Sequence, residues 1–252
     1  MDIPLNLNWL EATSLAAVRM TAFLFLAPPF SFSAIPKRVK AMLAIGLSLA
    51  VSPAITPHYH TLETADYLMA LVLEIVVGAV LGALVMIIFS AIQSAGGLID
   101  MFGGFSMAQG FDPLSMINGA QFTRLFQMTA LALMFSSGAY QIIIGGLTRS
   151  FTAIPIGGGM DLSSPVAAMA SGLTQMFLAS VQIAGPLLVV LFLADAGLGL
   201  LTRVAPALNA FTMSFPVKIL LTLTLVGVIF VALPGIVNNL TGQAIKVIGG
   251  VG

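Results

Sequence analysis

The sequence contains no cysteine and very few charged side chains. Without cysteine the chain has no disulfide, no thiolate metal ligand and no thiol nucleophile. Charged residues make up 7% of it, whereas about 25% is usual for a soluble domain. Nine basic and nine acidic residues give a formal net charge of +0, so nothing in the charge indicates nucleic-acid binding. The composition argues against a soluble or nucleic-acid-binding protein.

Common catalytic motifs are also missing. The sequence has no Walker A pattern and no G-x-G-x-x-G, H-E-x-x-H or G-x-S-x-G motif. His58 and His60 share a polar stretch with Glu63 and Asp66 and could in principle ligate a metal. An H-x-H pair is weakly specific, and a solvated loop is the favoured interpretation. We therefore predict that the chain is not an enzyme and holds no cofactor or metal.

What the sequence does contain is long apolar runs. Hydrophobic residues form 59% of the chain and its mean hydropathy is +1.09. A helix that crosses a membrane needs about 20 mostly apolar residues. Six stretches approach that length: 10–30, 41–57, 67–92, 125–147, 166–194 and 214–237. None alternates strictly between polar and apolar residues, as barrel strands would. The chain is predicted to be all-α, a membrane-type helical protein with about six long apolar helices or broken helical hairpins.

The ends and breaks of these helices are predicted from a few residues. The first 14 residues include acidic Asp2 and Glu11 but no basic residue, so we expect the first stretch to be retained rather than cleaved as a signal peptide. Pro186 lies well inside the fifth stretch and predicts a helix that is bent or split there. No polar linker divides the chain, so residues 1–252 are predicted to form a single integral membrane unit.

Basic residues suggest an orientation in the membrane. Lys37, Arg38 and Lys40 lie between the first two apolar stretches, whereas residues 58–66 contain no Lys or Arg. Since basic loops stay on the cytoplasmic side, we expect the first connection inside and the second outside. Arg149 does not fit this topology.

One helix face in the third stretch suggests a contact surface. Glu74, Gly78 and Gly82 are four residues apart, so they share a face, and the glycines allow another helix to approach closely. A carboxylate at the bilayer centre costs roughly 2.5 to 3.5 kcal/mol. We expect Glu74 to be paired, near an interface or away from lipid, and the face to contact another subunit.

A second polar face occurs in the fifth stretch. Ser171, Gln175 and Gln182 fall within about 40° of one another on a helical wheel. Hydrogen bonding within the chain is slightly favoured over lining a pore.

The most unusual segment is residues 93–119. Six glycines interrupt its apolar run: Gly96, Gly97, Gly103, Gly104, Gly110 and Gly119. Glycine at this density disfavours continuous helix. Irregular backbone at membrane depth requires burial in protein or a cavity, and the equally supported alternative is an interfacial loop that dips into lipid. Asp100 and Asp112 lie within the segment, and Asp112 is more typical of a turn than of a proton carrier.

Three strings together resemble the FliR family of flagellar export-gate proteins, whose relatives also occur in virulence type III secretion systems. They are APPFSFSAIPKRVK at 27–40, GGFSMAQGFDP at 103–113 and DAGLGLLTRVAPALNAFTMSFPVK at 195–218. Each is moderately specific alone, but their order and spacing cover almost the whole chain.

The resemblance implies a core subunit of the flagellar type III export gate. Such a protein assembles with several copies of FliP and FliQ, is served by FlhB and FlhA, and passes unfolded flagellar subunits. It lies in the lipid of the bacterial inner membrane, in the flagellar basal body, with parts of the gate above the bilayer plane. By the same resemblance, residues 1–160 are FliP-like and residues 166–252 form a FliQ-like helical hairpin. Whether the system builds a flagellum or an injection needle stays open, with the flagellum favoured.

The resemblance also implies a pore plug at 103–113. Phe105, Met107 and Phe111 are the candidate plug residues, and which of them seals is open. Apolar, deformable side chains can exclude water and ions at rest and yield when a polypeptide is pushed through.

Charged residues are assigned in the same way. Lys37, Arg38 and Lys40 match the family's basic loop, for which a topological role is favoured over contact with FlhB. Asp195 and Arg203 match the C-terminal motif, where they are expected to pair with a neighbouring subunit.

The alternative function is a small secondary transporter with a glycine-broken helix at its binding site. That interpretation predicts an internal repeat and a midplane polar cluster, and neither is evident in the sequence.

Overall fold

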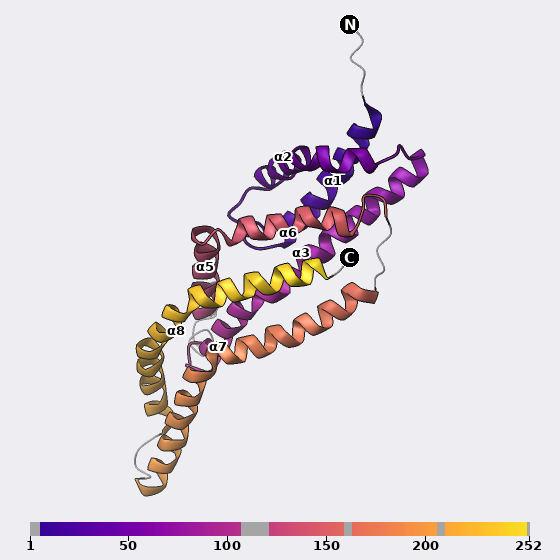
Figure 1. Cartoon of the computed structure of the whole chain (residues 1–252). Helices are drawn as coiled ribbons and strands as arrows, with labels where there is room; N and C mark the ends of the chain where they lie inside the picture. Colours follow the sequence, from indigo (N-terminus) through magenta and orange to yellow (C-terminus); the bar gives the residue numbers. More distant parts are fainter. Residues whose placement is uncertain (1–5, 107–120, 159–162, 206–209, 251–252) are drawn as a thin grey trace, which may run out of the picture. The chain divides into compact units, whose positions relative to one another are not determined.

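The computed structural model describes residues 6–106, 121–158, 163–205 and 210–250, and every regular element among them is a helix (Figure 1). The α-helices are α1 (Leu7–Leu26), α2 (Lys37–Ile55), α3 (Thr64–Phe102), α5 (Gln121–Ser136), α6 (Ala139–Ala153), α7 (Ser163–Val204) and α8 (Ala210–Gly249), with a 3-10 turn at Thr56–His58. Within these described ranges, five helices are long and apolar enough to cross a membrane, or six if α5 and α6 count as one broken span. The chain is an all-α, membrane-type helical protein, as predicted.

The helices contribute to two compact units. The first unit comprises Met1–Ile88, Met134–Leu173 and Leu240–Gly252. The second comprises Phe89–Leu133 and Thr174–Asn239. The assignment of residues 1–160 and 166–252 to FliP-like and FliQ-like portions stays a prediction.

The first unit is built around α1. Asn6 caps this helix, because its Oδ1 accepts a hydrogen bond of 3.2 Å from the Trp9 amide. The helix ends at Leu26, just before Pro28 and Pro29, neither of which can supply a helical amide. One face of α1 packs on α2, and its buried side chains include Leu15, Ala16, Met20, Phe23 and Leu24.

Two glycines allow α3 to approach α1 closely. A Cβ at Gly78 would overlap the carbonyl oxygen of Arg19 and lie 3.0 Å from Ala22 Cβ. A Cβ at Gly82 would lie 2.9 Å from Leu26 Cβ. The close approach expected of these glycines therefore occurs within the chain.

The basic residues after the first apolar stretch are helical. Lys37, Arg38 and Lys40 lie in the first turn of α2, not in a loop, because Pro36 supplies the carbonyl that accepts from the Lys40 amide. Lys40 is buried, with its ammonium 5.5 Å from the centre of the Phe25 ring. Their topological role stays a prediction.

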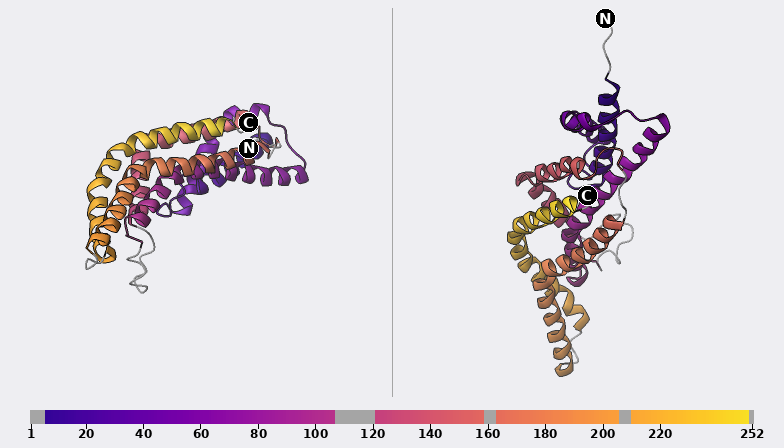
Figure 2. Two further views of the ribbon diagram at one scale, coloured as in Figure 1. Left: turned by 90° about the horizontal axis from the view of Figure 1, so that it is seen from below. Right: turned by 45° about the vertical axis from the view of Figure 1, so that its right-hand side comes forward.

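Three helices differ from their predicted extents. The stretch 125–147 is not one helix, because Gly138 adopts a left-handed φ of +74° between α5 and α6. The third stretch continues through Gly96 and Gly97 to Phe102, ten residues beyond the predicted end. Helix α7 runs to Val204, ten residues beyond the predicted end, and passes through Pro186 without the split that was one of the two outcomes predicted there. Within the second unit, α7 and α8 lie side by side as a hairpin (Figures 1 and 2).

Candidate functional site

The first unit contains a buried ion pair between α1 and α3. Arg19 Nε donates to Glu74 Oε2 at 2.5 Å, and Arg19 Nη2 donates to Glu74 Oε1 at 3.0 Å. Relative exposure is 0% for Arg19 and 1% for Glu74. Two parallel bonds make this a fork-to-fork pair, the geometry that suits guanidinium and carboxylate. The expectation that Glu74 is paired is thus met inside the chain.

The pair also fastens the end of α6. Arg19 Nη1 donates to the carbonyl oxygens of Ser150 at 3.3 Å and Ile154 at 2.9 Å, which belong to the last turn and C-cap of α6. The Ser150 carbonyl also accepts from the Ile154 amide at 2.8 Å, whereas the Ile154 carbonyl lies past the last helical turn, and a cation is favourable at a helix C-terminus. Glu74 Oε1 accepts from the Gly157 amide at 3.2 Å. Three chain segments therefore meet at one charge pair.

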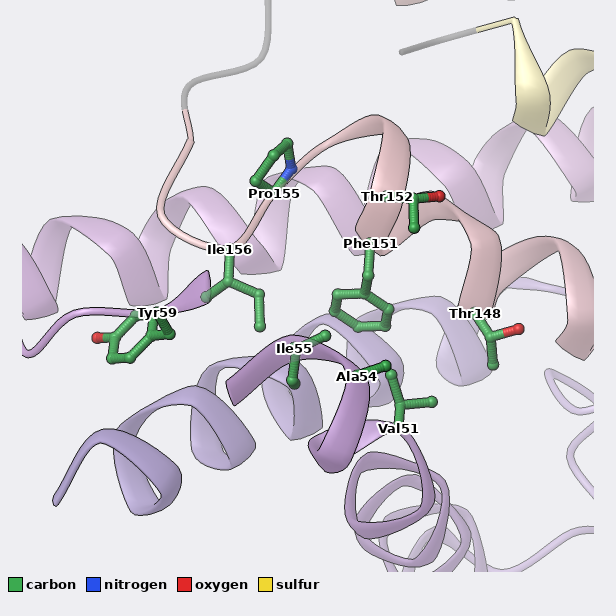
Figure 3. Close-up of a pocket in the computed structure, with 9 residues that line it drawn as sticks. All are labelled: Val51, Ala54, Ile55, Tyr59, Thr148, Phe151, Thr152, Pro155 and Ile156. Atoms are coloured by element: carbon green, nitrogen blue, oxygen red, sulfur yellow. The ribbon is translucent and has the colours of Figure 1, made fainter. Parts of the chain in front are cut away.

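Phe151 separates this pair from a cavity. The Arg19 guanidinium carbon lies 4.4 Å from the centre of the Phe151 ring. The cavity has a volume of about 330 Å³. Figure 3 shows the ring projecting from α6 toward the end of α2, with Ile156 and Tyr59 on one side. The cavity is lined by Val51, Ala54, Ile55, Tyr59, Thr148, Phe151, Thr152, Pro155 and Ile156.

A polar contact lies beside this cavity. The Tyr59 hydroxyl donates to Glu11 Oε2 at 3.0 Å, and the Leu62 amide donates to the same oxygen at 3.3 Å. Burial and then the hydrogen bond to Glu11 raise the pKa of Tyr59 well above its ordinary value. Among the residues that the structure describes, no three His, Cys, Asp or Glu side chains gather closely enough to hold a metal ion.

In the second unit, Asp100 binds the start of α5. Its Oδ1 accepts from the Phe122 amide at 2.9 Å, and its Oδ2 accepts from the Thr123 amide at 2.8 Å and Thr123 Oγ1 at 3.0 Å. The carbonyl oxygen of Asp100 accepts from the Ser106 amide at 3.1 Å. One residue thus holds both Ser106 and Phe122, which flank residues 107–120.

Aromatic packing continues from this point. Phe105 and Phe122 meet edge to face with ring centres 5.0 Å apart. The centre of the Phe126 ring lies 6.4 Å from that of Phe122 and 5.3 Å from that of Phe230 in α8, again edge to face. Phe105 is therefore placed against the core of the second unit.

The remaining plug candidates are not placed. Met107 and Phe111 lie outside the described residues, as does Asp112. The assignment of Phe105, Met107 and Phe111 to a plug stays a prediction.

The α7–α8 hairpin carries a second ion pair. Lys218 Nζ lies 2.6 Å from Asp195 Oδ2, and Ser214 Oγ donates to Asp195 Oδ1 at 3.1 Å. This pair is partly exposed, and such pairs contribute at most about 1 kcal/mol. Arg203 is exposed in the last turn of α7. Whether Asp195 and Arg203 also pair with a neighbouring subunit stays a prediction, as it does for Glu74, Gly78 and Gly82.

Arg19 was missed by the sequence reasoning. The sequence contains a simple indication of its role: Arg19 is the lone basic residue in the first apolar stretch, and Glu74 is the lone charged residue in the third. Because isolated charges are costly at membrane depth, two of opposite sign are expected to meet. The partners of the Asp100 carboxylate are two backbone amides and the Thr123 hydroxyl, which left no comparable signal.

The chain matches a family model and several characterised proteins. Residues 10–244 match the model described as "Bacterial export proteins, family 1". Flagellar biosynthetic protein FliR of Escherichia coli (strain K12) is 31% identical over 87% of this chain and 84% of its own length. Yop proteins translocation protein T of Yersinia pestis is 31% identical over 70% of this chain and 69% of its own. Surface presentation of antigens protein SpaR of Shigella sonnei is 25% identical over 90% and 89%.

Proposed function

The chain belongs to the bacterial export proteins of family 1, the FliR family, and we propose that it is a core subunit of the flagellar type III protein-export gate. The match confirms the resemblance that the sequence suggested. The protein is a membrane component of a type III export apparatus, related to both flagellar and virulence proteins. We propose a structural role in the bacterial inner membrane rather than catalysis.

The partners in this proposal are FliP and FliQ homologues, with FlhB and FlhA serving the assembled gate and unfolded flagellar subunits as cargo. Apolar surface on the long helices supports assembly. In the most apolar windows of α1 and α3, 44% of residues are buried inside the chain, compared with 28% for α7 and 22% for α2 and α8. Large apolar side chains such as Phe192, Val228 and Val231 stay exposed. Surface of this kind needs lipid or other subunits to cover it.

One observation carries the plug part of the proposal. The segment that matches the family's plug leaves α3 at Gly103 and is followed by α5, and Asp100 holds both flanks. Phe105, its first apolar candidate, is packed against Phe122 at that base. In our proposal Phe105, Met107 and Phe111 close the resting channel, because apolar side chains exclude water and ions.

Glycine substitution tests the plug. A triple Phe105→Gly, Met107→Gly, Phe111→Gly variant is expected to increase ion conductance of the assembled gate, measured in membranes of cells or in planar bilayers. The matched control replaces the same positions with leucine, which keeps apolar volume and should leave the gate sealed. Both variants must co-purify with FliP and FliQ. An assembled glycine variant with unchanged conductance would contradict the plug.

Purification from native membranes in mild detergent tests the partners. We expect a large assembly that contains FliP and FliQ homologues. A lone monomer that binds a small solute would instead support the secondary transporter.

A further inference from the structure

We infer that Asp100 is a positioning residue of this gate: it fastens the end of α3 to the start of α5 and thereby fixes the position of Phe105, the first plug candidate, relative to α5. The inference rests on the proposed function. It assigns a role to a buried acid that neither the plug nor the ion pairs use.

The carboxylate acts on α5 as an N-cap supplied from another helix. Phe122 and Thr123 are the second and third residues of α5, and their amides are the donors that an N-cap side chain normally satisfies. A negative charge at this end is also favoured by the helix dipole. Asp100 is 22 and 23 residues away along the chain, so its bonds hold two helices together in addition to capping one.

The backbone of Asp100 acts on the opposite flank. Its carbonyl accepts from the Ser106 amide at 3.1 Å, and the carbonyl of Ile99 accepts from the Gly103 amide at 2.8 Å. Asp100 therefore holds both the backbone that leaves α3 and the backbone at the start of α5.

Gly96 makes this reach possible. It lies four residues before Asp100 on the same face of α3, where a Cβ would fall 2.7 Å from both the Phe122 carbonyl oxygen and Thr123 Cα. The two backbones touch at Gly96, which leaves the Asp100 carboxylate within hydrogen-bond distance of the amides. Asp100 itself is 1% exposed, and a buried carboxylate is tolerated because three donors satisfy it.

The consequence is that the end of α3 and the start of α5, the base of the plug, stay joined whether the gate is closed or open. Phe105 keeps its edge-to-face contact with Phe122 only if α3 and α5 stay joined. If the bonds of Asp100 are lost, Phe105 loses its fixed position relative to Phe122, and the seal weakens without any change in the plug side chains.

The absence of cysteine allows a direct test. A Cβ built at Gly97 would lie 3.5 Å from Thr123 Oγ1, and because a cysteine at position 123 would place its sulfur near that oxygen, the two side chains start close enough for a disulfide. In the assembled gate, Asp100→Ala is expected to raise ion conductance by about tenfold or more, the factor that losing one charge-assisted hydrogen bond implies. Adding Gly97→Cys and Thr123→Cys and oxidising the pair should restore wild-type conductance, and reduction should release the leak again.

The rescue separates positioning from a general loss of structure. Asp66→Ala removes the same charge from an exposed position in the first turn of α3 and should leave conductance unchanged. Gly97→Cys alone, with the same oxidant, controls for oxidation. An oxidised Asp100→Ala gate that still leaks would overturn the inference.

A second measurement tests the inference if the Asp100→Ala variant does not assemble into a gate. With Asp100 intact, the oxidised Gly97→Cys, Thr123→Cys gate should secrete flagellar subunits at the reduced rate or close to it, because the base need not open. Blocked secretion on oxidation would show that the base opens and would refute the role. If the glycine plug variant leaks and Asp100→Ala does not, this inference fails alone; if the plug variant does not leak, the proposed plug fails.

Discussion

Arg19 of α1 and Glu74 of α3, 55 residues apart in sequence, form a two-bond ion pair that is wholly buried in the first unit. Glu74 also accepts a hydrogen bond from the Gly157 amide, and Arg19 donates to the carbonyl oxygens of Ser150 and Ile154 at the end of α6. A buried pair is weak evidence for stability, because desolvation offsets much of the attraction. Its clearer consequence is specificity: an alternative packing of α1, α3 and α6 would leave a charge unpaired in an apolar interior.

Removing one partner of this pair is expected to be far more damaging than removing both. Arg19→Met or Glu74→Leu alone should each lower the free energy of unfolding by about 3 to 5 kcal/mol, because the other charge stays buried without a partner. The double variant Arg19→Met, Glu74→Leu should recover most of that loss. Thermal unfolding of the protein in mild detergent measures all three. A double variant as unstable as the sum of the singles would show that the pair does not act as a unit.

The partly exposed pair provides the control. Asp195→Ala and Lys218→Ala, singly or together, should change the free energy of unfolding by less than about 1 kcal/mol in the same assay. Losses similar to those of Arg19→Met would indicate that burial does not decide the effect.

Close packing at Gly78 leads to a prediction with a matched control. Gly78→Ala places a methyl group against the backbone of Arg19, which has no room to move aside, so α1 and α3 must separate. Overpacking of this kind costs about 1 to 3 kcal/mol. Gly46→Ala in α2 meets nothing within 4 Å and should stabilise the helix by about 0.5 to 1 kcal/mol. The free energy of unfolding, measured in detergent, should therefore fall for Gly78→Ala and rise for Gly46→Ala. Equal effects of the two substitutions would refute the packing argument.

The sequence predicts the helical class for a physical reason that is local. Apolar runs of sufficient length can only be helices in a membrane, and Pro28 and Pro29 end α1 because proline cannot continue a helix. The extent of α3 is different. Gly96 and Gly97 are poor helix residues, yet tertiary packing of Gly96 on Phe122 outweighs a propensity cost of about 1 kcal/mol each.

The buried charged sites could likewise be predicted only in part. Glu74 could be predicted to need a partner, and Arg19 was the partner that a search for lone charges would have found. The bonds of Asp100 could not be foreseen, because two backbone amides and a threonine hydroxyl donate them and the residues involved are separated by 22 and 23 positions. Ser137 and Gly138 carried a weak signal for the break between α5 and α6, since one left-handed glycine suffices to end a helix.

Phe151 is expected to protect the Arg19–Glu74 pair from the neighbouring cavity (Figure 3). Phe151→Ala should destabilise the protein by about 3 to 5 kcal/mol, because it enlarges that cavity and opens it toward a charged pair. Phe151→Leu keeps most of the apolar volume and loses the cation–π contact, worth about 0.5 to 2 kcal/mol. Phe177→Ala, at a site that is 62% exposed, is the control and should cost less than either. Equal losses for alanine and leucine at position 151 would contradict the shielding role.

The two charges of the C-terminal motif should respond differently to charge reversal. Asp195 already pairs with Lys218 across the α7–α8 hairpin, so Asp195→Lys should reduce secretion of flagellar subunits and Lys218→Asp in the same chain should restore it. Arg203 is exposed, and in the proposed gate its counterpart lies on a neighbouring subunit. Arg203→Glu should therefore be rescued by a basic substitution in FliQ and not by one in this chain. Secretion into the medium, with co-purification of FliP and FliQ as the check on assembly, measures both. If the Lys218→Asp exchange fails to rescue Asp195→Lys while a change in FliQ succeeds, the pair within the hairpin is not the one that secretion requires.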